Sequence, residues 1–285
     1  MMKRYILFSL LLALPLSLAA QRTIRRPSKS KVENSKPKSS SKTNPNPKSA
    51  STINCQAELK KLINNMVYVS GGTFTMGATS EQGSDAWDNE KPTHIVTLSS
   101  FYLCKYEVTQ ALWRAVMGNN PSNLKGDNLP VEQVSWNDCQ TFISRLNNLT
   151  GKKFRLPTES EWEYAARGGN RSRGYKYSGS NNPSDVAWYE DNSGSKTHPV
   201  GSKSSNELGL YDMSGNVYEW CSDWDGTYSS SSQTNPTGPS SGALRARRGG
   251  SSLFNARNCR SSCRGGDATD GRYMNIGFRL ALSHL

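Results

Sequence analysis

The stretch GLYDMSGNVYEWCSDW, residues 209–224, constrains the fold more than any other part of this sequence. Its first half indicates a turn, because Gly215 and Asn216 can adopt the positive φ angles that most residues avoid. Its second half is apolar and aromatic. Asp212 and Glu219 place one carboxylate on either side of the turn. The sequence therefore predicts a bent segment that carries two acidic groups.

These acidic groups suggest a metal site. The backbone carbonyls of Gly215 and Val217 can turn inward between Asp212 and Glu219, which would make the segment rich in oxygen ligands. Hard cations such as Ca²⁺ prefer such ligands. The alternative is a plain Ser-Gly-Asn hairpin turn whose acids face water. Spacing alone leaves both interpretations open, because only two strong ligands are visible.

The length and composition favour one loop-rich α+β domain preceded by an unfolded segment. The chain has 285 residues, of which 34% are hydrophobic, and its seven Trp and twelve Tyr supply bulk for a core. The 24 Gly and 13 Pro argue against long regular helices. We place the domain at residues 54–285.

The formal charge of +12 is concentrated near the N-terminus. Lys3 and Arg4, together with nine basic residues and one acidic residue between 21 and 50, supply ten of these charges. The remainder of the chain is therefore nearly neutral. This distribution excludes a nucleic-acid-binding domain from the expected functions.

Two segments precede the expected domain. Residues 1–20 combine a basic start, an apolar run and small residues at the end, which is typical of a signal peptide cleaved after Ala19 or Ala20. An uncleaved membrane anchor is the alternative. Residues 21–53 are rich in Ser, Lys, Pro, Asn and Thr, and we expect a disordered tether. The protein is therefore expected to be exported to the periplasm, cell envelope or outside, with no transmembrane segment after cleavage. The tether offers contacts to anionic envelope polymers or lipid headgroups.

Periodicity predicts several elements in the first half of the domain. We expect a short helix at Cys55–Asn64, a hairpin over residues 66–76 and further strand over residues 95–106. A helix is expected to open at Thr109 and to stop at Gly118.

Two capping boxes mark further helices. Ser135 with Asp138, and Thr158 with Glu161, have the spacing in which a hydroxyl and a carboxylate cap a helix N-terminus reciprocally. From residue 179 onward we expect turns and short strands rather than helices. The helix that Ser135 opens has an apolar stripe, which comprises Trp136, Cys139, Phe142, Ile143 and Leu146.

The six cysteines do not reveal their pairing. They stand at positions 55, 104, 139, 221, 259 and 263. Export would permit disulfides, and an even number is consistent with full pairing, but six cysteines allow 15 connectivities. Cys259 and Cys263 have no accompanying histidine pattern and are weak candidates for a zinc site.

Three segments together resemble the formylglycine-generating enzyme (sulfatase-modifying factor) family. They are the central stretch, LPTESEWEYAARGG before it and RRGGSS…NIGFRLAL after it. The segment GGTFTMG…EKPTHIVTLSSFYLCKYEVTQALW is similar to the same family. The resemblance runs from about Met66 to the C-terminus in the family's order. It implies a C-type-lectin-like α+β fold with short strands and few helices.

The resemblance implies an enzymatic activity, but this sequence lacks one of the residues that the activity requires. The family enzyme is a copper-dependent oxidase that converts a sulfatase cysteine to formylglycine, using cysteines three and eight residues beyond the serine of an RGGS motif. Here the motif ends at Ser251, the second position is Cys259 and the first is Phe254. Cys259 and Ser251 are therefore the catalytic candidates. Copper is not expected, because one thiolate cannot supply the two-sulfur site that Cu(I) prefers.

The calcium pattern of the family is better preserved. The resemblance implies a site formed by Asp212, the carbonyls of Gly215 and Val217, and Glu219. Calcium is therefore the expected cofactor. A second family site would fall on Asp185, the Val186 carbonyl, Asn192 and Gly194.

Three functions follow as hypotheses. The first is a non-catalytic, calcium-stabilised binding or scaffold protein of the cell envelope, whose partner is an exported or envelope protein. The second is an oxidase that uses Cys259 in an altered thiol site to convert a cysteine of a sulfatase or other exported protein. The third is a polyanion binder that uses residues 21–50.

Overall fold

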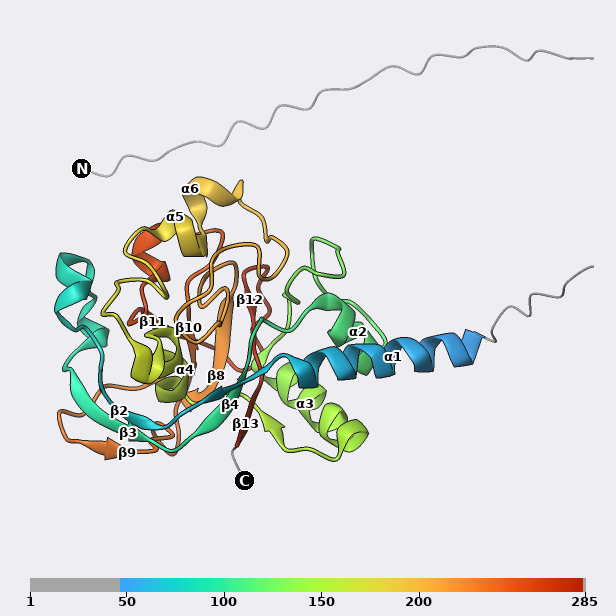
Figure 1. Cartoon of the computed structure of the whole chain (residues 1–285), viewed down its shortest axis with the longest axis horizontal. Coiled ribbons are helices and arrows are strands. Elements are labelled where there is room, and N and C mark those ends of the chain that lie inside the picture. Colours follow the sequence, from blue (N-terminus) through green and yellow to red (C-terminus); the bar gives the residue numbers. More distant parts are fainter. Residues whose placement is uncertain (1–46, 284–285) are drawn as a thin grey trace, which may run out of the picture. The chain divides into compact units, whose positions relative to one another are not determined.

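The computed structural model describes residues 47–283. The predicted signal peptide and residues 21–46 of the predicted tether lie outside the described residues. About half of the described chain is loop, which connects short strands and helices in the expected mixed α+β arrangement (Figure 1). No helix within residues 47–283 is both long and apolar enough to cross a membrane.

Four small sheets form the framework. The first has the order β1-β4-β13-β5 and the second β11-β10-β8-β12, while β2-β3-β9 and β6-β7 are smaller. Most neighbouring pairs are antiparallel, but β12 runs parallel to β8. The strands are β1 (Met66–Val69), β2 (Gly72–Met76), β3 (His94–Leu98), β4 (Phe101–Cys104), β5 (Phe154–Arg155), β6 (Ala187–Trp188), β7 (Ser214–Gly215), β8 (Tyr218–Trp224), β9 (Gln233–Thr234), β10 (Arg245–Arg248), β11 (Arg264–Asp267), β12 (Ile276–Gly277) and β13 (Ala281–Ser283).

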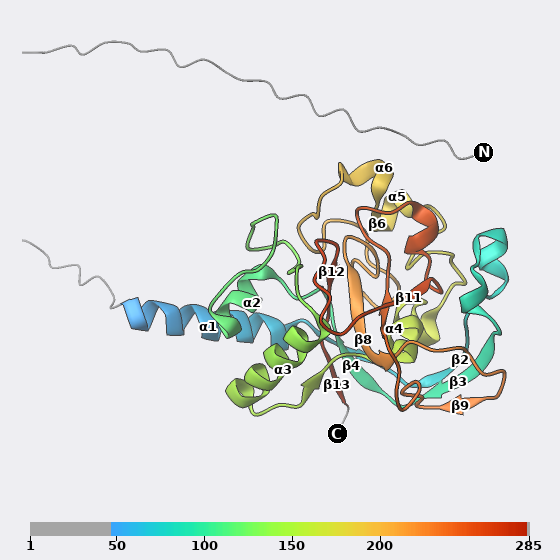
Figure 2. The same ribbon diagram turned by 180° about the vertical axis from the view of Figure 1, so that it is seen from behind.

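Six α-helices and four short 3₁₀ helices lie within the described residues. Helices α1, α2 and α3 pack in succession beside the first sheet, as Figure 2 shows from behind. The α-helices are α1 (Pro47–Asn64), α2 (Gln110–Met117), α3 (Trp136–Thr150), α4 (Glu159–Ala166), α5 (Pro183–Val186) and α6 (Glu190–Ser193). The 3₁₀ helices are η1 (Ser80–Asp85), η2 (Asp88–Glu90), η3 (Gly169–Arg171) and η4 (Ala256–Cys259).

The helix boundaries that rest on capping chemistry are confirmed. The Thr109 side chain accepts from the Leu112 N–H at the start of α2. Both capping boxes are present, with Ser135 opening α3 and Thr158 opening α4. Each box satisfies backbone donors that would otherwise lack a partner in the first helical turn.

Of three predictions about local structure, one is wrong and two are confirmed in part. The hairpin over residues 66–76 does not form, because β1 pairs with β4 and β2 pairs with β3. The strand structure predicted over residues 95–106 is present, as the two strands β3 and β4. Helix α1 begins at Pro47 rather than Cys55. Alternating apolar residues identify a strand but do not reveal its partner, and the polar residues ahead of Cys55 carry no apolar stripe to mark the helix.

The region after residue 179 also differs from expectation. It contains α5 and α6, each a single turn of helix, where only turns and strands were predicted. Asn182 caps α5 by accepting from the Ser184 N–H, and Tyr189 opens α6. Helices of four residues are too short to show an apolar period in the sequence.

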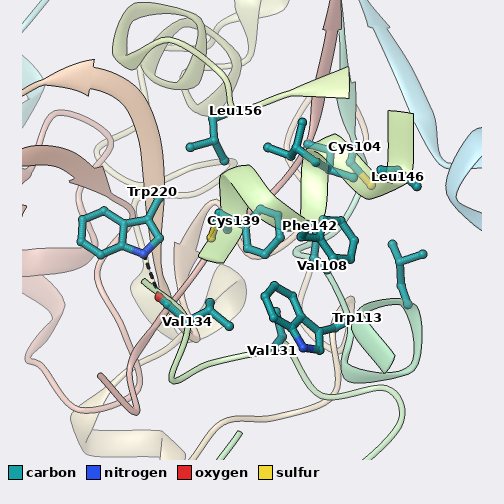
Figure 3. Close-up of a cluster of buried hydrophobic side chains, with 14 of the residues drawn as sticks. Cys104, Val108, Trp113, Val131, Val134, Cys139, Phe142, Leu146, Leu156 and Trp220 are labelled. Carbon is teal, nitrogen blue, oxygen red and sulfur yellow. Dashed lines mark hydrogen bonds between the residues drawn. The ribbon is translucent and has the colours of Figure 1, made fainter. Parts of the chain in front are cut away.

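The main core fills the space between the first two sheets and helices α2 and α3 (Figure 3). Trp113 stacks on Phe142, with ring centroids 5.2 Å apart. The Trp220 indole on β8 donates to the Val134 carbonyl over 3.0 Å, which satisfies its only polar group inside the core. The apolar stripe predicted for α3 is thus largely confirmed: Cys139, Phe142, Ile143 and Leu146 are buried, and Trp136 is half-buried.

All six cysteines carry free thiols in the structure, so the full pairing that their even number allowed does not occur. Cys104 and Cys139 belong to the main core. Burial raises the pKa of both thiols, which keeps them protonated. They therefore act as small apolar side chains.

Candidate functional site

The turn before β8 has the conformation that its sequence predicts. Gly215 and Asn216 both have positive φ angles, of 82° and 60°. A Cβ atom on Gly215 would lie 2.3 Å from the Trp188 carbonyl oxygen, so only glycine fits where β7 pairs with β6. Asp212 also has a positive φ, of 57°. The turn thereby brings the two acidic groups of the central stretch into the protein interior.

Glu219 is held by a buried ion pair. The Arg279 guanidinium donates to both carboxylate oxygens over 2.6 Å, and neither side chain is exposed. The Trp162 indole donates to Glu219 Oε2 over 2.7 Å. Arg279 also donates to the Tyr211 carbonyl over 2.9 Å. Glu219 is therefore fixed from two sides by charged and neutral donors.

Two more carboxylates lie beside this pair, one of which the sequence analysis missed. Asp212 Oδ2 accepts from the Gly201 N–H over 2.7 Å. Glu107 accepts from the Val217 N–H over 3.1 Å and from the Asn216 amide over 2.6 Å. Both acids are buried. Glu107 comes from the loop between β4 and α2, more than a hundred residues before the turn, so no spacing rule connects it to the site.

The three acids Glu107, Asp212 and Glu219 are together called the carboxylate group below. Among the described residues they have only one cation beside them, Arg279. Burial, followed by repulsion from the other two acids, raises the pKa of Glu107 well above its ordinary value. Burial raises the pKa of Asp212 to about 6. The positive charge of Arg279 lowers both pKa values but does not offset the effect of burial. A cation at this place would relieve the repulsion.

The donor chemistry of this place fits a hard cation, with one restriction. Asp212, Glu107 and the backbone carbonyl groups of the turn supply oxygen atoms, which are the ligands that Ca²⁺ prefers. Glu219 would have to share its carboxylate with Arg279. Within residues 47–283, no group of three or more His, Cys, Asp or Glu side chains is gathered closely enough to hold a metal by itself. A calcium ion would therefore depend on backbone carbonyls such as those of Gly215 and Val217.

The residues of the second predicted calcium site have local structural roles. The exposed Asp185 carboxylate accepts from Ser180 over 2.9 Å and from Asn182 over 3.0 Å at the start of α5. Asn192 accepts from the Tyr189 N–H over 2.9 Å and so completes the cap of α6. Gly194 ends α6 in the left-handed conformation, and the Val186 side chain is buried. Calcium at this loop stays a prediction.

The predicted catalytic residues lie at the opposite end of β8 from Trp224. Ser251 is fully buried, and its hydroxyl accepts from the Asn275 amide over 3.4 Å. The Phe254 ring is 40% exposed and meets the Tyr218 ring edge-on, with centroids 5.7 Å apart. An aromatic ring therefore stands at the protein surface where the resemblance places the first thiol.

The thiol of Cys259 is enclosed. It packs in a small cluster with the side chains of Tyr177 and Tyr189, and a Cβ atom on Gly250 would lie 2.7 Å from its Sγ. Burial, with a smaller contribution from Cys263, raises the pKa of Cys259 far above that of a free thiol. Burial likewise raises the pKa of Cys263 to about 11. Both cysteines are therefore protonated near neutral pH and are poor nucleophiles and metal ligands.

Comparison with known proteins places the chain in a family. The sequence model described as "Sulfatase-modifying factor enzyme 1-like domain" matches residues 53–284. The chain is 38% identical to the "Chaperone protein LppX" of Paenibacillus barcinonensis over 211 residues, which cover 56% of this chain and 72% of that protein. It is 33% identical to the "Formylglycine-generating enzyme" of Streptomyces coelicolor over 284 residues, covering 75% and 88% of the two chains.

Solved structures agree with this assignment. Treponema denticola variable protein 1 has a TM-score of 0.70 and 33% identity, covering 77% of this chain and 95% of that chain. PvdO from Pseudomonas aeruginosa has a TM-score of 0.62 and 28% identity, covering 77% and 94%. The family model spans nearly all of the described residues, and the predicted resemblance and loop-rich α+β fold are thereby confirmed. The chain belongs to the sulfatase-modifying factor enzyme 1-like domain family.

Proposed function

We propose that this chain is an exported, non-catalytic binding or scaffold protein of the cell envelope, whose domain is stabilised by calcium. The observation that carries the proposal is the pair of changes at the family's reaction centre. Phe254 stands at the first thiol position, and the remaining Cys259 is buried. A partner of such a protein would be another exported or envelope protein.

The loss of oxidase chemistry follows from what Cu(I) requires. Two thiolates form its preferred site in proteins, whereas the Phe254 ring has no atom that can ligate the ion. The high pKa of Cys259 adds a cost, because the thiol must lose its proton before it binds a metal. A relative that is 38% identical is named a chaperone, which is consistent with a role in handling other proteins.

An oxidase with an altered thiol site remains the second candidate. One observation favours it: the thiols of Cys259 and Cys263 are close enough to influence each other electrostatically. Relatives that are about as similar are named formylglycine-generating enzymes. Copper binding separates the two functions. We expect the purified full chain to take up no stoichiometric Cu(I) in competition with a chromogenic chelator, and Cys259→Ser to behave identically. Uptake that disappears in Cys259→Ser would favour the oxidase.

Calcium is expected to stabilise the domain through the carboxylate group. At a calcium concentration about one hundred times the Kd, binding to the folded state alone adds about 2.7 kcal/mol to the free energy of unfolding. For a domain of this size, the melting temperature should rise by roughly 5–10 °C. Thermal unfolding of the full chain in excess EDTA and in a calcium series measures this shift.

The matched variants are Asp212→Asn and Asp191→Asn. The first removes a charge from the carboxylate group and keeps an oxygen for the Gly201 N–H, so most of the calcium-dependent shift should disappear. The second removes a charge from an exposed residue of α6 and should leave the shift intact. If the melting temperature does not respond to calcium in the unaltered protein, the calcium part of the proposal is wrong, while the absence of oxidase activity is not affected.

A further inference from the structure

A small cavity of about 130 Å³ lies among the segments that carry Glu132, Thr197 and Ser252. Its lining has two kinds of side chain. Glu132, Thr197 and Ser252 are polar, and Leu124, Leu253 and Met274 are apolar. The calcium proposal and the oxidase alternative use none of these residues.

The polar side chains of this cavity have unused hydrogen-bonding atoms. Glu132 Oε2, Thr197 Oγ1 and Ser252 Oγ are buried and have no hydrogen-bond partner among residues 47–283. Glu132 and Ser252 are each 1% exposed, and Thr197 is 6% exposed. Leaving one such atom unpaired costs about 1–3 kcal/mol. The ionised Glu132 oxygen can only accept and both hydroxyls can accept as well, so three such atoms in the lining of one cavity point to a bound group that donates hydrogen bonds.

The protein holds the Glu132 carboxylate in a fixed position. Its Oε1 accepts from the N–H groups of Asn123 and Leu124, the second over 3.2 Å. Its own N–H donates to Ser122 Oγ over 3.2 Å. One oxygen of the carboxylate is thus satisfied by the backbone, and the other, Oε2, has no partner among residues 47–283.

The apolar side chains make an entrance. Leu124 is 41% exposed and Met274 is 44% exposed, while both also line the cavity. A ligand can therefore enter from solvent past aliphatic groups. This combination suits a molecule with a hydrocarbon stem and a polar tip, because the stem can pack on the rim while the tip reaches the buried oxygen atoms.

We infer that this cavity binds a primary alkylammonium group, presented either by a lysine side chain of another polypeptide or by a free alkylamine. An ammonium has three N–H donors and no acceptor, which matches the three unpaired oxygen atoms. The cavity has room for about four water volumes, enough for the ammonium and part of its stem.

The charge of Glu132 supports an ammonium rather than a neutral donor. Burial raises the pKa of Glu132 to about 7, although the two amide donors and Lys125 act against the increase. A bound ammonium would stabilise the ionised carboxylate. Lys125 is itself engaged with the carbonyls of Asn120 and Ser122. Lys196 also lines the cavity and is exposed, so its own ammonium is a competitor for the same oxygen atoms.

The test is calorimetric titration of the full chain with three probes. These are an acetylated, amidated Gly-Lys-Gly peptide, the same peptide with norleucine in place of lysine, and n-butylamine. We expect the lysine peptide to bind at least about tenfold more tightly than the norleucine peptide, which has the same stem without the charge. Binding of the lysine peptide but not of butylamine identifies a polypeptide as the source, and equal binding identifies a free amine.

Three variants decide whether this cavity is responsible. Glu132→Gln should weaken lysine-peptide binding at least about tenfold, whereas Glu190→Gln, an exposed acid on α6, should have no effect. Lys196→Met should leave the affinity unchanged or increase it, and an increase would show that Lys196 occupies the same place. Melting curves verify that each variant is folded. Equal affinity for the lysine and norleucine peptides, or unchanged binding by folded Glu132→Gln, would overturn the inference.

The copper and calcium experiments do not bear on this result. The cavity would bind an ammonium in an active oxidase as well as in a scaffold, since Phe254 and Cys259 do not line it. The titration with amines can therefore fail while the proposed function stands, and the reverse also holds.

Discussion

Replacing Arg279 by Met is expected to lower the free energy of unfolding by about 3–5 kcal/mol, because it leaves a buried carboxylate without its counter-charge. Arg279 is fully buried and donates to both oxygens of Glu219 over 2.6 Å. It is also a cation whose charge acts on Glu107 and Asp212. Urea unfolding of the full chain, followed by tryptophan fluorescence, measures the loss.

An exposed arginine provides the matched control for this variant. Arg272 pairs with Asp138 over 2.7 Å, but its side chain is 53% exposed. Arg272→Met should therefore cost less than about 1 kcal/mol. The double variant Arg279→Met with Glu219→Gln should regain part of the loss, because it removes the uncompensated charge. Equal effects of Arg279→Met and Arg272→Met would mean that the buried pair does not hold the site together.

Asp223→Asn is expected to change how stability depends on pH. Asp223 lies at the end of β8, where it accepts from the Glu159 N–H over 3.0 Å and from the Ser222 hydroxyl over 2.8 Å. Burial, with repulsion from Glu159, raises the pKa of Asp223 to about 7. The folded protein thus binds this proton more tightly than the unfolded chain, in which the pKa is about 3.9.

The sign of the effect follows from this difference. The stabilisation from the protonated Asp223 is fully present below about pH 4 and is lost as the pH rises to about 7. The slope is at most about 1.4 kcal/mol per pH unit. Asp223→Asn removes this slope, so the variant should become more stable relative to the unaltered protein between pH 4 and pH 8. Urea unfolding at several pH values measures the difference.

Other acids also titrate in this range, so the comparison between variants is decisive. Asp191→Asn, in which the altered residue is exposed, should show the same pH dependence as the unaltered protein. If Asp223→Asn also follows the unaltered protein from pH 4 to pH 8, Asp223 is ionised in the folded state with an ordinary pKa.

Local chemistry explains which parts of the fold were predictable. The starts of α3 and α4 follow from Ser135 and Thr158, because a capping box is completed by residues three positions apart. The turn at Gly215 follows from the backbone freedom of glycine and asparagine. Partners distant in the sequence were not predictable. β1 pairs with β4 across the intervening β2 and β3, and no pattern in residues 66–76 encodes that choice.

The candidate site shows the same division. The two acids of the central stretch, Asp212 and Glu219, could be read from the sequence, and both are buried beside the turn. Arg279 and Glu107 could not be assigned to them, because each is at least 60 residues away in the sequence. Only folding brings Arg279 to Glu219 and Glu107 to Asn216. Glu132 gave no signal either. Its significance lies in one oxygen atom that has no partner in the described part of the chain, which is a property of the packed structure.

The most direct test of the central claim is oxygen consumption by the purified full chain with copper and a cysteine-containing peptide. The formylglycine-generating enzyme of Streptomyces coelicolor, 33% identical, serves as the comparison protein. With Phe254 at the first thiol position and Cys259 buried, we predict no copper-dependent oxygen uptake and no change in the mass of the peptide. Oxygen uptake that requires copper, accompanies conversion of the peptide cysteine and disappears in Cys259→Ser would contradict the account.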